Sequence, residues 1–167
     1  MPFLYRLCHK HTLSIKQLYY ALQIVVTKHL ALRTSLNFDS EKNLLIQRIV
    51  AHYTNRKSPF TFTESIFDAD EQIVNIMQNE KRNSQLFNLA QGLVFRCHLV
   101  YYKQISSDNL LTDKDVIIFN FHPASFDFPS MDIFLHDLDQ AYTIGQFTTE
   151  NITNVNYLDC EYSCFSI

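Results

Sequence analysis

The sequence predicts an α/β domain in which a mixed β-sheet is covered by helices. Apolar residues recur at helical spacing in some segments and alternate, or run without interruption, in others. The 167 residues, of which 47% are apolar and 19% charged, suffice for one domain with a substantial core. With only two glycines and four prolines, most of the chain is expected to lie in regular elements.

Three segments have the pattern of amphipathic helices, namely residues 14–29, about 70–82 and 130–142. Ser14 and Gln17 form a capping-box pattern at the start of the first. Asp68 or Asp70 is expected to cap the second, and Ser130 the third. Apolar stripes on all three indicate helices that pack on a sheet.

The expected strands are residues 32–38, 44–50, 60–63, 93–102 and 116–121. A turn-rich stretch joins the first two, so they are expected to form a hairpin. Residues 116–121 are nearly all apolar, as in a strand that is buried on both faces. Residues 106–114 are expected to be a polar loop and 146–167 to be irregular. The order of the main elements, α-β-β-α-β-β-α, indicates a mixed sheet with helical layers.

Charge and hydropathy exclude several classes of function. The net charge is -3, and no basic stretch forms a footprint for nucleic acid or an anionic membrane surface. The first residues lack the apolar core of a signal peptide, and no apolar run could cross a membrane. The sequence therefore predicts a cytoplasmic protein with no nucleic-acid or membrane partner.

The four cysteines are Cys8, Cys97, Cys160 and Cys164, and they form no CxxC pair. His9 and His11 lie close to Cys8, but no second group of ligands has the spacing of a zinc site. No metal site is expected, and reduced thiols fit an intracellular protein.

Four stretches of the chain have the character of motifs: residues 28–36 (KHLALRTSL), 87–96 (FNLAQGLVFR), 121–130 (FHPASFDFPS) and 157–162 (YLDCEY). In this order they resemble the RHExLRTxF, FDLxxGPLxR, HHxxxDG and YxDYAxW motifs of condensation domains of the nonribosomal peptide synthetase type. The resemblance extends over nearly the whole chain. It implies that residues 1–167 are a single partial condensation domain, the amino-terminal lobe, with the fold of chloramphenicol acetyltransferase and with the second lobe absent.

The resemblance also implies a reaction and its partners. Condensation domains join an aminoacyl or peptidyl thioester on a donor carrier protein to an amine on an acceptor carrier protein. Both substrates arrive on the phosphopantetheine of the carrier proteins, and no cofactor is bound by the domain itself. The expected partners are carrier-protein domains and a second lobe, with self-association through the exposed inter-lobe face as a further expectation.

The motif alignment places Asp127 at the aspartate of HHxxxDG, which puts His122 at the first histidine and Pro123 at the catalytic second histidine. Proline has no titratable group, so it can neither deprotonate an amine nor donate to an oxyanion. In an extended chain neighbouring side chains face opposite sides, so His122 is expected to point away from the tunnel. His122 is therefore interpreted as a histidine hydrogen-bonded to the backbone.

Two further expectations follow from the same alignment. Asp127 is expected to form a buried ion pair with Arg33, since the family pairs these two motif positions. Phe128, where the motif has glycine, and Ser130 are expected to line the substrate tunnel.

Three functions are consistent with the sequence. The first is a condensation-type acyltransferase lobe whose chemistry is impaired by Pro123. The second is a non-catalytic module that binds carrier proteins, and the third is a decayed gene fragment.

Overall fold

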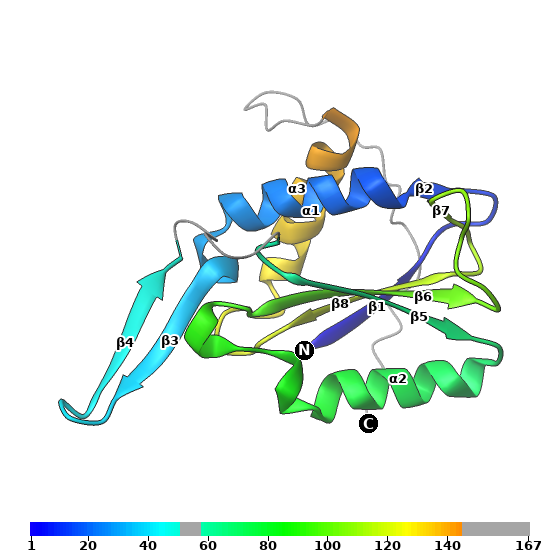
Figure 1. Cartoon of the computed structure of the whole chain (residues 1–167). Helices are drawn as coiled ribbons and strands as arrows, with labels where there is room; N and C mark the ends of the chain where they lie inside the picture. The colour runs from blue at the N-terminus through cyan, green and yellow to red at the C-terminus, as the bar shows by residue number, and fades with distance from the viewer. Residues whose placement is uncertain (51–57, 145–167) are drawn as a thin grey trace.

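A four-stranded mixed sheet separates two layers of helix (Figure 1). The computed structural model describes residues 1–50 and 58–144. The strands are β1 (Pro2–Arg6), β2 (Leu13–Ser14), β3 (Thr34–Asp39), β4 (Leu44–Ile49), β5 (Thr61–Phe67), β6 (Phe95–Tyr102), β7 (Leu110–Leu111) and β8 (Val116–Phe121). The helices are α1 (Ile15–Lys28), α2 (Asp70–Arg82) and α3 (Ser130–Ile144), with 3-10 turns η1 (Leu30–Arg33), η2 (Ser84–Leu86) and η3 (Leu89–Gln91).

The central sheet has the strand order β1-β8-β6-β5. β8 pairs antiparallel with both β1 and β6, whereas β5 and β6 are parallel. A parallel pair needs a crossover connection, and α2 supplies it between β5 and β6. The expected neighbourhood of the strands at 93–102 and 116–121 is confirmed, with Leu99 opposite Ile117.

The helices α1 and α3 cover one face of the sheet and α2 covers the other (Figure 1). Phe119 and Phe121 of β8 belong to the larger core cluster under α1 and α3. Val116 and Ile118, on the opposite face of the same strand, pack with Ile73 of α2. Burial on both faces explains why β8 reads as an uninterrupted apolar run.

Several local predictions are confirmed. Ser14 caps α1, and its side chain accepts a hydrogen bond from the backbone N–H of Gln17 at 3.3 Å. β3 and β4 form the expected hairpin, which extends away from the body of the molecule (Figure 1). The apolar stripes of α2 and α3 face the two core clusters as expected.

Other predictions are wrong in detail. Neither Asp68 nor Asp70 caps α2: the cap position is Ala69, and no side chain makes the cap bond. Asp70 lies in the first turn, where it forms an ion pair with Arg6 at 3.0 Å. The pairing of Arg6 requires β1, a strand the sequence did not predict, because five residues give too short an alternation to stand out.

The remaining corrections concern loops. Residues 106–114 contain β7, which pairs with β2 through Leu13 and Leu111. β5 extends to Phe67, beyond the expected end at residue 63, because polar residues in the middle of the strand hide its alternation. The predicted irregular segment 146–167, with its YLDCEY stretch, lies outside the described residues.

Candidate functional site

The loop that connects β8 to α3 carries the HHxxxDG-like stretch. His122 follows β8 directly, and its backbone N–H donates to the Val94 carbonyl at 2.8 Å. Its Nδ1 accepts a hydrogen bond from the backbone N–H of Ala124 at 3.1 Å. The ring stands edge-on to Phe87, with the ring centroids 5.5 Å apart. His122 is therefore held to the backbone, in the way the sequence predicted.

These contacts fix the protonation state of His122. Burial lowers the pKa of the imidazole below its ordinary value, and the positive charge of the chain's first amine lowers it further. The ring is therefore neutral at pH 7. Because Nδ1 accepts from Ala124, the proton lies on Nε2. With the proton on Nε2, only Nδ1 of the ring has a lone pair, and that lone pair accepts from the Ala124 N–H.

Pro123 and Phe128, the two positions that depart from the motif, are both exposed. The side chain of Phe128 is 57% exposed, and its ring centroid lies 6.0 Å from that of Phe3 in β1. Phe126, in the same loop, stacks on Phe121 with a centroid separation of 3.8 Å. Aromatic contacts therefore hold this loop against the end of the sheet.

Arg33 and Asp127 do not form the expected buried ion pair in the structure of the described residues. Asp127 is exposed, and its carboxylate accepts hydrogen bonds from the backbone N–H of Ser130 at 3.1 Å and from the Ser130 hydroxyl. Arg33 donates from Nη1 to the carbonyl of Val50 at 2.9 Å, and its buried Nε has no partner among the described groups.

The physical reason for this difference is local. A carboxylate three residues before a helix-terminal N–H can satisfy that donor without ordering any distant group. Asp127 therefore accepts from the first turn of α3 through Ser130, and not from Arg33 as the sequence led us to expect. Ser130 is the first residue of α3 and not its cap.

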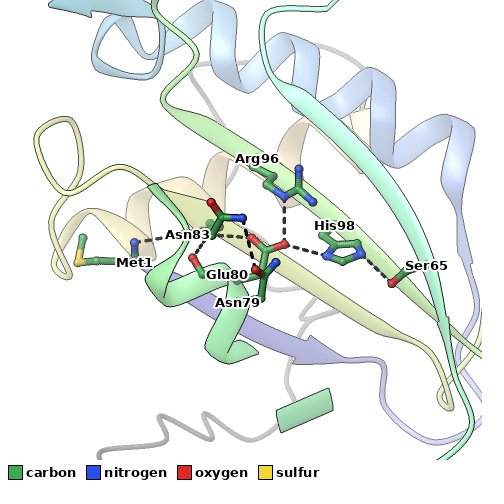
Figure 2. A network of polar contacts seen from close by, with 8 residues as sticks. Met1, Ser65, Asn79, Glu80, Asn83, Arg96 and His98 are labelled. Carbon is green, nitrogen blue, oxygen red and sulfur yellow. Dashed lines mark hydrogen bonds and ion pairs between the residues drawn. The ribbon is translucent and has the colours of Figure 1, made fainter. Parts of the chain in front are cut away.

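A second set of polar side chains lies on the opposite face of the sheet, between the sheet and α2 (Figure 2). Its centre is Glu80, near the end of α2, which is only 2% exposed. The carboxylate accepts from Arg96 Nε at 3.0 Å, from Asn120 Nδ2 at 2.8 Å, and pairs with His98 Nδ1 at 2.8 Å. The other ring nitrogen of His98, Nε2, lies 2.8 Å from the Ser65 hydroxyl.

The charge state of Glu80 follows from its partners. Burial by itself raises the pKa of a carboxyl group, but the hydrogen bonds from His98 and Asn120 and the charge of Arg96 outweigh it. The net pKa of Glu80 lies below its ordinary value, so the group is an anion at neutral pH. The Glu80 cluster, which consists of Ser65, Glu80, Arg96, His98 and Asn120, joins α2 to three adjacent strands.

Neither a protein-family model nor a curated protein matches the sequence. Solved structures do match the fold. The epimerization domain from the third module of tyrocidine synthetase B is 18% identical, with a TM-score of 0.65, over 87% of this chain and 30% of that one. The condensation domain of monacolin K polyketide synthase is 13% identical, with a TM-score of 0.63, over 89% and 29%. The X-domain from teicoplanin biosynthesis is 25% identical, with a TM-score of 0.60, over 85% and 27%. The chain has a condensation-domain-like fold.

The chain spans 27–30% of the length of these condensation-domain-like structures. The α/β class with a mixed sheet and helical layers is confirmed by the same matches. Within this fold, the loop at residues 122–129 and the Glu80 cluster lie on different elements and share no hydrogen bond among those described.

The condensation-domain-like stretch at residues 28–36 is held by a contact that the sequence did not predict. Asp137 of α3 is buried, and its carboxylate lies 2.7 Å from Lys28 Nζ and 2.6 Å from His29 Nε2. The signal that could have revealed it is a charged residue within the apolar stripe of α3. Lys28 and His29 therefore fasten the end of α1 to α3.

The stretch at residues 87–96 depends on its glycine. Gly92 has a φ of +69°, and a Cβ at this position would lie 2.8 Å from Val50 Cγ2 and 3.4 Å from the Arg33 carbonyl oxygen. Only glycine adopts this conformation without strain and allows so close an approach. Gly92 thus packs two of the condensation-domain-like stretches, 28–36 and 87–96, against each other.

The Glu80 cluster was also missed at the level of sequence. Its signal is subtle: Arg96, His98 and Asn120 are polar residues that alternate with apolar ones in strongly apolar strands. Alternation shows that they share a face, but not that Glu80 from a helix lies opposite. Long-range contacts of this kind require the packed fold.

Within residues 1–50 and 58–144, no group of three or more His, Cys, Asp or Glu side chains is arranged to hold a metal ion. The His9 ring, near Cys8, instead contacts the carboxylate of Asp113 at 2.8 Å. No helix in the same residues is both long enough and apolar enough to span a membrane.

Proposed function

We propose that this condensation-domain-like chain is a binding module for a carrier protein and does not itself form amide bonds. The observation that carries the proposal is the state of the motif loop. Pro123 has no group that could act on an amine, and the one lone pair of the neutral His122 ring, on Nδ1, accepts a hydrogen bond from the Ala124 backbone. By the resemblance to condensation domains, the loop after β8 lacks the histidine that those domains use for chemistry.

The kind of partner is supported by a similar protein. The X-domain from teicoplanin biosynthesis, 25% identical over 85% of this chain, is found in a complex with OxyB. A condensation-domain-like fold can therefore serve as a surface for another protein. By analogy, a carrier protein that presents phosphopantetheine is the partner proposed for this chain.

A surface suited to a protein partner lies on the β3–β4 hairpin. Phe38, Leu45 and Ile49 share one face of the hairpin and are 64%, 66% and 51% exposed. Exposed apolar groups that cluster in this way are typical of protein-binding surfaces.

The deciding experiment is a condensation assay with aminoacyl-loaded donor and acceptor carrier proteins. The unmodified chain is compared with a Pro123→His, Phe128→Gly variant, each with and without a second condensation lobe added in trans. A matched control, Ala124→His, places the same imidazole at the next exposed position of the loop. We expect no amide from the unmodified chain or the control, and product from the repaired variant when the second lobe is present.

Amide formed by the unmodified chain would overturn the proposal and make the chain an acyltransferase. Binding is measured in parallel by titration calorimetry with a phosphopantetheinylated carrier protein. Leu45→Glu is expected to weaken binding, whereas Ile105→Glu, at a similarly exposed position in the β6–β7 connection, is expected to leave it unchanged. Absence of binding, together with no product from the repaired variant, would favour a decayed fragment.

A further inference from the structure

The Glu80 cluster contains a linear chain of three side chains that have the chemistry of an activated nucleophile. Glu80 Oε1 lies 2.8 Å from His98 Nδ1, and His98 Nε2 lies 2.8 Å from Ser65 Oγ. Figure 2 shows the three residues in this order, with the imidazole between the carboxylate and the hydroxyl. These three side chains come from a helix (α2), a central strand (β6) and an edge strand (β5).

The direction of each hydrogen bond follows from the groups involved. An ionised carboxylate can only accept, so His98 donates from Nδ1 to Glu80. When the ring carries no second proton, its lone pair is on Nε2, and the Ser65 hydroxyl donates to it. A serine hydroxyl that donates to an imidazole oriented by a carboxylate is the arrangement that activates serine as a nucleophile.

We propose that Ser65 is a nucleophilic serine that is acylated by small esters, with His98 as its general base and Glu80 as the residue that positions the imidazole. This site lies apart from the loop at His122 and uses none of its residues. The inference therefore stands whether or not the chain binds a carrier protein.

Ser65 is within reach of a ligand because β5 is an edge strand of the sheet. Ser65 itself is half-buried and lies on the face of the sheet that α2 covers. Among the described residues no further strand pairs with the outer edge of β5, so this edge is the proposed side of approach for a small ester. His98, by contrast, is buried, so its ring is shielded from water while it holds the hydroxyl.

A second hydroxyl group, that of Thr63, lies on the same strand as the proposed nucleophile. Thr63 is two residues before Ser65, on the same face of β5, and lies opposite His98 in the strand register. Its Oγ1 is buried and has no hydrogen-bond partner among the described groups. The Thr63 hydroxyl is free to donate to the oxyanion that forms when an ester carbonyl is attacked.

The reaction balances with water as the only co-reactant. Ser65 Oγ bonds to the ester carbonyl carbon as its proton passes to His98 Nε2. The bond from the carbonyl carbon to the ester oxygen then breaks, and the leaving alcohol takes the proton from His98. Water attacks the acylated Ser65 by the same path in reverse and releases a carboxylic acid and the free hydroxyl.

The test uses the whole chain and an alkyl fluorophosphonate, which forms a phosphonyl ester with an activated serine and releases fluoride. Peptide mapping by mass spectrometry locates the adduct, and p-nitrophenyl acetate measures turnover. In the unmodified chain we expect the adduct on Ser65 to form at least about 100-fold faster than on Ser106, because general-base catalysis contributes about 10²–10⁴-fold. Ser106 is a suitable internal reference because its hydroxyl bonds to a carboxylate, Asp108, and not to an imidazole.

Three variants sharpen the result. Ser65→Ala should abolish the adduct and the acetate hydrolysis, His98→Gln should reduce both at least about 100-fold, and Ser106→Ala should change neither. Equal labelling of Ser65 and Ser106 in the folded, unmodified chain would overturn the proposal even if His98→Gln fails to fold. A folded His98→Gln variant that labels Ser65 at the unmodified rate would overturn the part assigned to His98.

Discussion

Replacing Glu80 with alanine is the most informative perturbation of this fold. The substitution removes the carboxylate that accepts from Arg96, His98 and Asn120. The side chains of Arg96 and His98 are only 11% and 10% exposed, so water cannot fully replace the lost partner. A cation and two polar groups are then left buried without their acceptor.

The magnitude follows from the burial. Breaking a buried ion pair by removing one partner costs about 3–5 kcal/mol. In a chain of this size each kcal/mol lowers the melting temperature by about 2–4 °C, so a fall of roughly 6–20 °C is expected. Asp70→Ala is the matched control: it breaks an ion pair on the same helix, but one whose side chains are 42% and 80% exposed. The control should cost about 1 kcal/mol or less.

The assay is thermal unfolding followed by circular dichroism, repeated over a range of pH. The pKa of Glu80 is lower in the folded than in the unfolded chain, so its stabilisation is present above the unfolded value, near 4.5. It is lost as the pH falls through the lower, folded value. The gap in stability between the unmodified chain and Glu80→Ala should therefore shrink on acidification. Equal losses for Glu80→Ala and Asp70→Ala at neutral pH would refute the reasoning.

Three further predictions concern other parts of the fold. Gly92→Ala should destabilise the chain by about 1–3 kcal/mol in urea unfolding, because alanine is strained at a φ of +69° and its Cβ would collide with Val50; a neutral effect would contradict the packing described. Asp137→Ala should lower the free energy of unfolding by about 3 kcal/mol, because it removes two hydrogen bonds to a carboxylate, one of them from the half-exposed Lys28. A loss of stability below about 1 kcal/mol would show that the contact is not formed. Cys97 should resist iodoacetamide until the chain unfolds, because it is fully buried and burial raises the pKa of its thiol; modification of the native chain, detected by mass spectrometry, would show that β6 opens.

Prediction from sequence worked best where a pattern is local and long. The helices α1 and α3 carry apolar stripes over several turns, and the side chains of those stripes do lie in the core. β8 was recognisable because every one of its residues is buried. The motif stretches pointed to the condensation-domain-like fold that the solved structures support.

Prediction from sequence failed in two situations. In one, the residue that determines a structure is distant in sequence; in the other, a side chain can make either a local or a remote contact. Asp127 was expected to pair with Arg33. Instead, the nearby Ser130 donates a hydrogen bond to it, and no distant residue has to be positioned for this contact. β1 was missed because its alternation spans only five residues, and its strand character comes from pairing with β8. For β1 a tertiary contact decides the outcome, whereas for Asp127 the local contact with Ser130 replaces the expected remote one.

The sequence by itself determined the α/β class and the positions of the three main helices and of strands such as β6 and β8. These follow from periodicity and residue type, which are local properties. Only the tertiary structure decided that burial lowers the pKa of His122, and that Glu80, His98 and Ser65 are linked by hydrogen bonds. Burial and hydrogen-bond partners set the state of a polar group, and both arise only when segments far apart in sequence pack together.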